Sequence, residues 1–170
     1  MDFHIYRPDE MLADTVLTDF IFDTIVENLS WLFGDDMGSA ENREKWISYN
    51  LRTESPVLHA AVAEDLPERM GFILYAVEDR RLVFHDVEIA ASRRFSPKLL
   101  IGLFRTVFLA EGGHFDTMGG YINRRNGVSL DNFIRYATSV EERERGCSFV
   151  IDAGATQKII ARVCGRGENE

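Results

Sequence analysis

Three basic side chains stand together where a strand-like run gives way to a helix. Arg93, Arg94 and Lys98 follow the strand-like run Val83–Ile89, and a serine–proline pair lies among them at 96–97. A serine followed by a proline is typical of a helix N-terminus, where unpaired N–H groups and the positive end of the helix dipole attract anions. We therefore predict a site for a phosphate-bearing ligand at this turn. The alternative is a solvated basic loop.

Two carboxylates lie on the strand-like run itself, at Asp86 and Glu88. Residues two apart on a strand share a face, and like charges on one face raise the pKa of one of the two groups. A carboxylate placed in this way can accept a proton in acid–base chemistry. The alternative is that Glu88 faces solvent on an alternating strand. His85 is expected on the opposite face, as a partly buried histidine.

The charge of the chain is unevenly distributed along its 170 residues, which carry a net charge of −9. Residues 1–90 contain 19 acidic and 7 basic side chains, whereas residues 91–170 contain 9 acidic and 12 basic ones. A content of 45% hydrophobic and 28% charged residues is typical of one soluble globular domain. The acidic total argues against a nucleic-acid or membrane partner, while the basic second half favours an anionic ligand there.

Cysteine and histidine are few and scattered. Cys147 and Cys164 do not make a disulfide framework, and no two of the four histidines have metal-ligand spacing, so we expect no metal. The first residues lack the basic and apolar regions of a signal peptide, and no apolar run approaches the roughly 18 residues of a membrane span. We therefore expect a cytoplasmic protein.

Apolar periodicity and turn residues predict the elements that position these groups. A short strand at Phe3–Tyr6 is followed by helices over 14–33 and 39–52, and then by strands at Leu58–Ala63, Gly71–Val77 and Leu82–Ile89. Next come a helix from Ser96 to about Gly112, a strand at Phe115–Ile122, a helix from about Ser129, and strands at Cys147–Asp152 and Lys158–Val163. The predicted order is β-αα-βββ-α-β-α-ββ, which is a mixed α/β arrangement.

Over nearly the whole chain, this order resembles the GNAT N-acetyltransferase superfamily. The resemblance implies an α/β (α+β) acyl-CoA N-acyltransferase fold, with a mixed, mostly antiparallel sheet flanked by helices. It also implies a single domain over residues 1–165, followed by a frayed tail at 166–170.

The turn at 93–98 resembles the family's loop for the pyrophosphate of acetyl-CoA, whose pattern is [Gln/Arg]-x-x-Gly-x-[Gly/Ala]. Arg93 fits the first position, but Ser96 and Lys98 replace the two small residues, and Pro97 has no N–H to give. The resemblance implies acetyl-CoA as co-substrate, held largely by side chains of this degenerate loop and by neighbouring residues. The implied cofactor-binding residues are Ile89, Arg93, Arg94, Phe95, Ser96, Lys98, Leu99 and Asn126.

The resemblance also implies the catalytic residues. Several members of the family have a glutamate on the fourth strand, which makes Glu88 the candidate general base. Members often read Val-x-x-x-Asn after the fifth strand, followed seven residues later by a tyrosine that protonates the departing thiolate. This chain has Ile122 and Asn126 in that spacing but Phe133 in place of the tyrosine. Tyr136, one turn further on, can substitute; the alternative is a tyrosine that only packs.

Two functions follow from the resemblance. The first is an N-acetyltransferase that moves an acetyl group from acetyl-CoA to a primary amine of a cationic small molecule or a protein. Acidic residues in the 14–52 region favour such an acceptor, and homodimers are common in the family. The alternative is a catalytically degenerate binding or structural module that binds CoA weakly or not at all, as the altered loop and Phe133 indicate.

Overall fold

One seven-stranded sheet organises the chain. The computed structural model describes residues 1–54, 56–93 and 96–165, and the tail predicted at 166–170 lies outside them. The strands are β1 (Asp2–Tyr6), β2 (His59–Asp65), β3 (Glu68–Glu78), β4 (Arg81–Ile89), β5 (Thr117–Asn123), β6 (Ser139–Glu142) and β7 (Gly146–Ile151). Their order in the sheet is β1-β2-β3-β4-β5-β7-β6, and only the β4–β5 pair is parallel among these strands.

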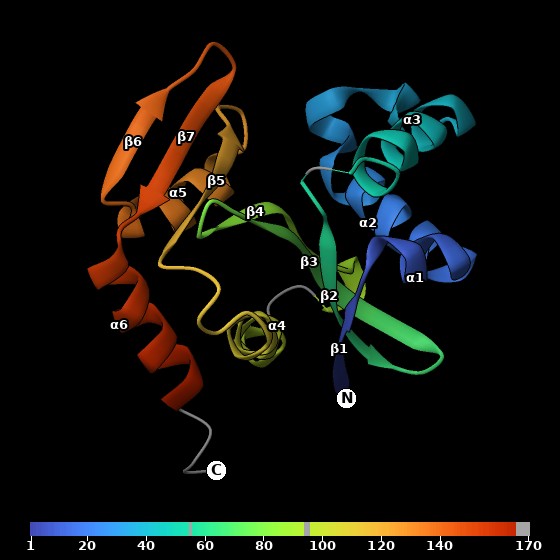
Figure 1. Cartoon of the computed structure of the whole chain (residues 1–170). Coiled ribbons are helices and arrows are strands. Elements are labelled where there is room, and N and C mark those ends of the chain that lie inside the picture. Colours follow the sequence, from blue (N-terminus) through green and yellow to red (C-terminus); the bar gives the residue numbers. More distant parts are fainter. Residues whose placement is uncertain (55, 94–95, 166–170) are drawn as a thin grey trace.

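Helices cover both faces of this sheet (Figure 1). They are α1 (Pro8–Ala13), α2 (Thr15–Phe33), α3 (Ala40–Leu51), α4 (Pro97–Ala110), α5 (Gly127–Phe133) and α6 (Ala153–Cys164). Three 3-10 turns are η1 (Asp35–Gly38), η2 (Ala91–Arg93) and η3 (Ile134–Tyr136). Among the described residues, no helix is both long and apolar enough to cross a membrane.

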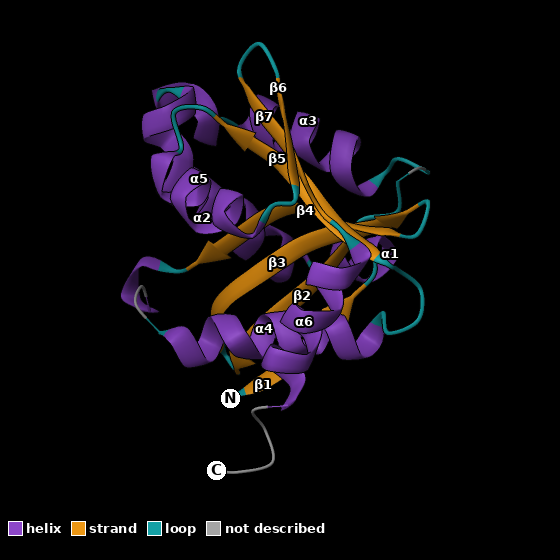
Figure 2. Cartoon of the chain, turned by 90° about the vertical axis from the view of Figure 1, so that its left-hand side faces the viewer, coloured by secondary structure: helices purple, strands orange, loops and turns teal. Residues whose placement is uncertain are grey.

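Two hydrophobic cores result, one on each face of the sheet. Phe72 and Leu74 of β3 pack with Ile21 of α2 on the face covered by α1, α2 and α3. Ile73 of β3 belongs to the other core, together with Leu103 of α4 and partly buried residues of α5 and α6. Figure 2 shows α4 and α6 next to each other. Alternate residues of one strand therefore serve two cores, and each strand residue has a definite side.

The predicted fold class is confirmed, and one predicted strand is wrong. Lys158–Val163 belongs to α6, whose N-cap Asp152 accepts a hydrogen bond from the N–H of Ala155 at 2.9 Å. Thr156, Ile159 and Val163 recur at helical spacing and face the core. The run of β-branched residues mimics a strand, but its apolar period is that of a helix.

Two elements were not predicted from the sequence. One is α1, which begins at Pro8, and the other is β6, whose four residues are all exposed. An exposed edge strand has no apolar alternation for a sequence pattern to detect. Of the two final strands that were predicted, Cys147–Asp152 corresponds to β7, and Lys158–Val163 lies in α6.

A buried ion network ties the start of α2 to the sheet. The Arg69 guanidinium lies 2.8 Å from the Asp14 carboxylate and 3.4 Å from the Glu64 carboxylate, which is 3% exposed. Asp14 also caps α2 by accepting from the N–H of Leu17 at 2.9 Å. Tyr6 donates to Glu64 at 2.8 Å, and burial together with this carboxylate raises the pKa of Tyr6 to about 12. The network fixes one end of α2 on β2 and β3.

Substitution Arg69→Met is expected to destabilise the fold strongly. It leaves the buried Glu64 carboxylate without its cation, a loss of about 3–5 kcal/mol in the free energy of unfolding. Urea denaturation measures this loss. The matched control is Arg80→Met, because Arg80 pairs with Asp116 at 2.6 Å on the exposed surface. The control is expected to cost about 1 kcal/mol or less. Equal small losses in the two variants would contradict the role given to Arg69.

Candidate active site

The β4 and β5 strands part after a short parallel contact. Residues Arg81–Phe84 pair with Thr117–Gly120, but β4 continues to Ile89 paired with β3 alone among the described strands. A Cβ at Gly119 would lie 2.7 Å from the Phe149 carbonyl oxygen, and one at Gly120 would lie 2.8 Å from the Phe84 carbonyl oxygen. These glycines therefore permit the close approach of backbones just where the two strands begin to diverge.

A β-bulge in β4 changes which way its side chains point. Phe84 pairs with Tyr75 and Asp86 pairs with Leu74, so His85 is an extra residue on β4. Phe84 packs in the α4 core, whereas His85 lines a hollow together with Leu58 and residues of α3. The expectation that His85 lies on the face opposite Asp86 is wrong, because the bulge turns it to the same face.

Asp86 and Glu88 share the face covered by α2, as their spacing predicts. Glu88 accepts a hydrogen bond from the Asn28 side-chain amide of α2 at 2.7 Å, and the same amide nitrogen donates to the Ile89 carbonyl oxygen at 3.0 Å. Burial, and secondly the charge of Glu88, raises the pKa of Asp86 to about 7. Two carboxylates therefore sit side by side at the parting of β4 and β5, and one of them titrates near neutral pH.

Asn28 was not singled out from the sequence, although a signal was present. It lies on the apolar stripe of α2, in helical register with Ile21, Ile25 and Leu32, all of which are buried. A polar residue within such a stripe needs a hydrogen-bonding partner, which β4 supplies.

The basic turn begins α4 as predicted, but without the expected serine cap. Ser96 is the N-cap residue and Pro97 begins the helix, yet the Ser96 side chain accepts no cap hydrogen bond. The Arg93 guanidinium lies 3.1 Å from the Glu68 carboxylate of β3, and both side chains are about half exposed. Lys98 is exposed. The turn thus presents cations at the surface beside the first turn of α4.

The other implied cofactor residues lie near this turn, at the start of α5 or outside the residues that the structure describes. Ile89 is half-buried at the end of β4, and Leu99 is a buried residue of α4 in the core beneath the turn. Arg94 and Phe95 lie outside the described residues. Asn126 is the N-cap of α5, where its side-chain oxygen accepts from the N–H of Ser129 at 3.2 Å.

The position of the implied general acid holds a packed phenylalanine. Phe133 of α5 lies against Phe149 of β7, with ring centroids 5.8 Å apart. Tyr136 falls in η3, beyond the end of α5, and its side chain is 44% exposed. The Arg135 guanidinium lies 4.9 Å from the centre of its ring. Tyr136 is therefore an accessible phenol whose partner is a cation.

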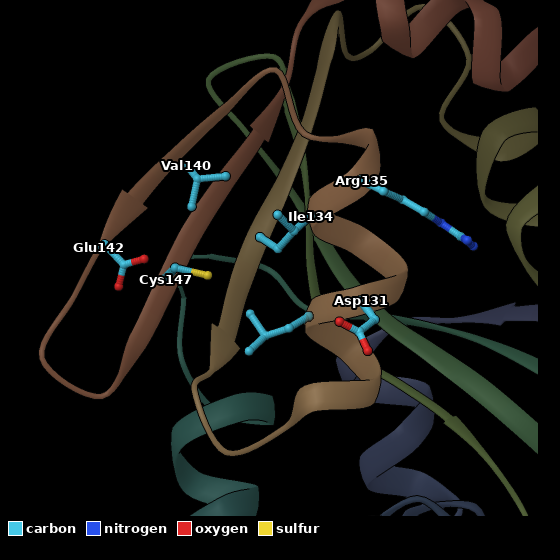
Figure 3. A pocket seen from close by; sticks show the side chains of 7 residues that line it. Asp131, Ile134, Arg135, Val140, Glu142 and Cys147 are labelled. Carbon is cyan, nitrogen blue, oxygen red and sulfur yellow. The ribbon is translucent and has the colours of Figure 1, made fainter.

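A separate hollow of about 450 Å³ lies between α5 and the β6–β7 hairpin. Ile134, Val140 and Cys147 line it, and burial raises the pKa of the Cys147 thiol. Figure 3 shows the Asp131 and Arg135 side chains on the other side of the α5–η3 ribbon from Val140 and Cys147. This hollow contains none of the predicted catalytic residues.

Comparison with known proteins finds the same fold. No protein-family model matches the chain, and no curated protein does. The PaiA N-acetyltransferase from Thermoplasma acidophilum, solved with coenzyme A, matches with a TM-score of 0.58 and 14% identity over 89% of this chain and 99% of that one. Aminoglycoside 6'-acetyltransferase type Ii matches with a TM-score of 0.63 and 16% identity over 90% and 97%. The diaminobutyrate acetyltransferase EctA from Paenibacillus lautus, solved with its substrate and coenzyme A, matches with a TM-score of 0.57 and 17% identity over 89% and 95%. The chain therefore has the GNAT N-acetyltransferase fold.

The raised pKa of Asp86 predicts a pH-dependent stability. The folded chain holds a proton on Asp86 up to about pH 7, whereas the unfolded chain, with an ordinary value near 3.8, loses it earlier. The folded state thus binds more protons between these values, and stability falls as the pH rises through this window, by up to about 1.4 kcal/mol per pH unit. Substitution Asp86→Asn should flatten this slope and give a variant more stable than the wild type at about pH 8.

Urea unfolding at several pH values measures this effect. Asp116→Asn is the matched control, because Arg80 holds the pKa of Asp116 below its usual value. That control should lose stability at neutral pH, and the loss should vanish as acid protonates the wild-type carboxyl. Parallel pH slopes in the wild type and Asp86→Asn would show that Asp86 is an ordinary carboxyl.

Proposed function

We propose that this chain is an N-acetyltransferase, which moves the acetyl group of acetyl-CoA to a primary amine. The observation that carries the proposal is the parting of β4 and β5 beside two carboxylates. The opening between the strands gives an extended thioester arm access to the sheet, and Asp86 and Glu88 stand where a proton must be removed. The fold shared with N-acetyltransferases solved with coenzyme A supports this proposal.

The residues near the start of α4 fit a pyrophosphate. Helix α4 runs for 14 residues, and its positive end meets the turn that carries Arg93 and Lys98. The Ser96 hydroxyl, which does not cap the helix, can donate to a phosphate oxygen. The Arg93–Glu68 pair is exposed, and such pairs are worth only about 0–1 kcal/mol, so a phosphate can take over Arg93 at little cost.

The proton chemistry falls to the two carboxylates. The amine nitrogen attacks the thioester carbonyl carbon, so that a C–N bond forms and the C–S bond breaks. The bound ammonium must first lose a proton, which Asp86, with a pKa near 7, takes directly or through water. The second proton, lost from the nitrogen once the C–N bond has formed, replaces the one that Tyr136 gives to the leaving thiolate, so that the products are an amide, a thiol and one proton. Glu88 accepts a hydrogen bond from the Asn28 amide, which positions its carboxylate to bind the ammonium before reaction. Tyr136 is the proposed donor of a proton to the leaving thiolate.

The acceptor that we propose is a cationic amine. The α2–α3 region beside the site exposes the acidic residues Asp23, Glu27, Asp36 and Glu41. Two proteins with this fold are an aminoglycoside acetyltransferase and a diaminobutyrate acetyltransferase bound to diaminobutyric acid, both named for amine-bearing compounds. Cytoplasmic location and homodimer formation stay predictions.

A catalytically degenerate module is the second candidate function. It is favoured by the ion pair between Arg93 and Glu68. Arg93 is the residue that fits the family's phosphate-loop pattern, and in this pair its guanidinium is bound to a carboxylate of the protein. The packing of Phe133 against Phe149 also favours it, because a phenylalanine cannot protonate a thiolate. The two candidates differ in whether acetyl-CoA binds and whether an amine is acetylated.

Calorimetry with acetyl-CoA tests the first step. We expect binding by the wild type, and an affinity lower by about 10- to 100-fold in the double variant Arg93→Ala/Lys98→Ala, since it loses charge-assisted hydrogen bonds to phosphate. Arg80→Ala is the matched control, because Arg80 is a surface arginine at the far end of β4. Absence of binding at high micromolar concentrations would favour the degenerate module.

Acetylation of a diamine, followed by thiol release, tests the proton chemistry. We expect kcat/KM to rise with pH through about 7 in the wild type, because Asp86 must lose its proton to act as a base. Asp86→Asn should lower kcat by about 10²- to 10⁴-fold and abolish this pH step, while acetyl-CoA affinity is kept. A variant that keeps both the rate and the pH step would exclude Asp86 as the base.

A further inference from the structure

A second hollow lies on the same face of the sheet as Asp86 and Glu88, and none of the functions proposed above uses it. It is formed where the C-terminal part of α3 and the following segment approach the bulge of β4, and its volume is about 110 Å³. Its lining residues are Tyr49, Asn50, Thr53, Pro56, Leu58 and His85. The hollow exists on this face because the bulge inserts His85 between Phe84 and Asp86.

The polar groups around this hollow offer hydrogen-bond acceptors. The His85 side chain is 31% exposed, and its Nε2 lies 4.0 Å from the Glu78 carboxylate. The Asn50 side-chain nitrogen donates to the Trp46 carbonyl oxygen at 2.9 Å, a bond that does not use the Asn50 side-chain oxygen. Burial lowers the pKa of His85, so its ring is neutral at neutral pH and keeps one acceptor nitrogen.

Charges near the hollow favour a cationic or hydroxyl donor over an anion. The Glu78 carboxylate lies beside the His85 imidazole. Arg81, the first residue of β4, is the cross-strand neighbour of Glu78. On the α3 side, Arg52 is already paired with Glu44. An imidazole nitrogen, an amide oxygen, a phenol and a carboxylate can together receive an ammonium or hydroxyl group.

The position of the hollow defines the length of the compound that could use it. His85 is three residues from Glu88 and one from Asp86 along β4. A strand advances about 3.3 Å per residue, so a nitrogen placed midway between Asp86 and Glu88, two residues from His85, lies about 7 Å from His85 along the strand. The volume equals that of about four water molecules, which is room for a small end group only.

We propose that this hollow is the distal subsite of the acceptor cleft. It holds the far end of an unbranched acceptor, which is a second ammonium or a hydroxyl group about 7 Å from the nitrogen that is acetylated. The inference rests on the proposed acetyltransferase activity and adds the class of acceptor, namely α,ω-diamines or amino alcohols. His85 is a specificity-determining residue that receives this end group, and Leu58 packs beneath the chain.

The test compares amines with and without a distal donor. Kinetics with 1,6-diaminohexane, 6-aminohexanol and hexylamine give the ratio of kcat/KM for each donor-bearing amine to that for hexylamine. We expect a ratio of about 10 or more in the wild type, because a hydrogen bond at the distal end adds to binding. Substitution His85→Phe keeps an aromatic ring in the lining of the hollow but removes the acceptor nitrogen, so the ratio should fall toward 1.

His114→Phe is the matched control. His114 is a mostly exposed histidine that follows the C-terminal end of α4 and lies next to Glu111. The control variant should keep the wild-type ratio. A wild-type ratio near 1, or a ratio that His85→Phe leaves unchanged, overturns the distal subsite while the acetyltransferase stands. If no amine is acetylated, the proposed activity fails, and calorimetry of 1,6-diaminohexane decides the subsite separately. Equal affinity of the wild type and His85→Phe for the diamine would then overturn it.

Discussion

The fold depends on the short parallel pairing between β4 and β5, which ends after the first residues of β4. Strand β4 is paired with β3 along its whole length, but with β5 over only four residues at its start. Gly119 and Gly120 allow the backbones to meet closely there, and beyond them the two strands go different ways (Figure 1). There the Asn28 side-chain amide of α2 donates hydrogen bonds to the Glu88 carboxylate and to the Ile89 carbonyl oxygen. One interrupted ladder thus creates the opening and explains why α2 carries a polar residue in its buried stripe.

The same strand separates two kinds of charge. On the α2 face it presents Asp86, Glu88 and, through the bulge, His85. Beyond the end of β4, Arg93 lies in the turn before α4 and Lys98 in the first turn of α4, and both are exposed. An anionic donor and a cationic acceptor can therefore approach from different sides and meet at the parting of the strands. The uneven distribution of charge along the chain, acidic first and basic second, is the sequence counterpart of this arrangement.

Local signals predicted most elements, and tertiary contacts decided the rest. Ser96 and Pro97 marked the start of α4 because their effect on a helix N-terminus is local, although the serine does not cap. The bulge at His85 depends on the register between β3 and β4, which no run of residues in β4 reveals. The strand predicted at Lys158–Val163 failed because β-branched residues outweighed a helical period that only packing against the core makes decisive. The shared face of Asp86 and Glu88 predicted a raised pKa for one of the two groups, but burial, the larger cause for Asp86, depends on tertiary packing.

A crystal structure of the protein with coenzyme A would show directly where the cofactor lies. We expect the extended arm of coenzyme A to enter the opening between β4 and β5, with its sulfur near Asp86 and its pyrophosphate at the first turn of α4. In that complex, Arg93 should have exchanged Glu68 for a phosphate oxygen. Coenzyme A seated in the hollow between α5 and the β6–β7 hairpin, with β4 and β5 untouched, would contradict the account.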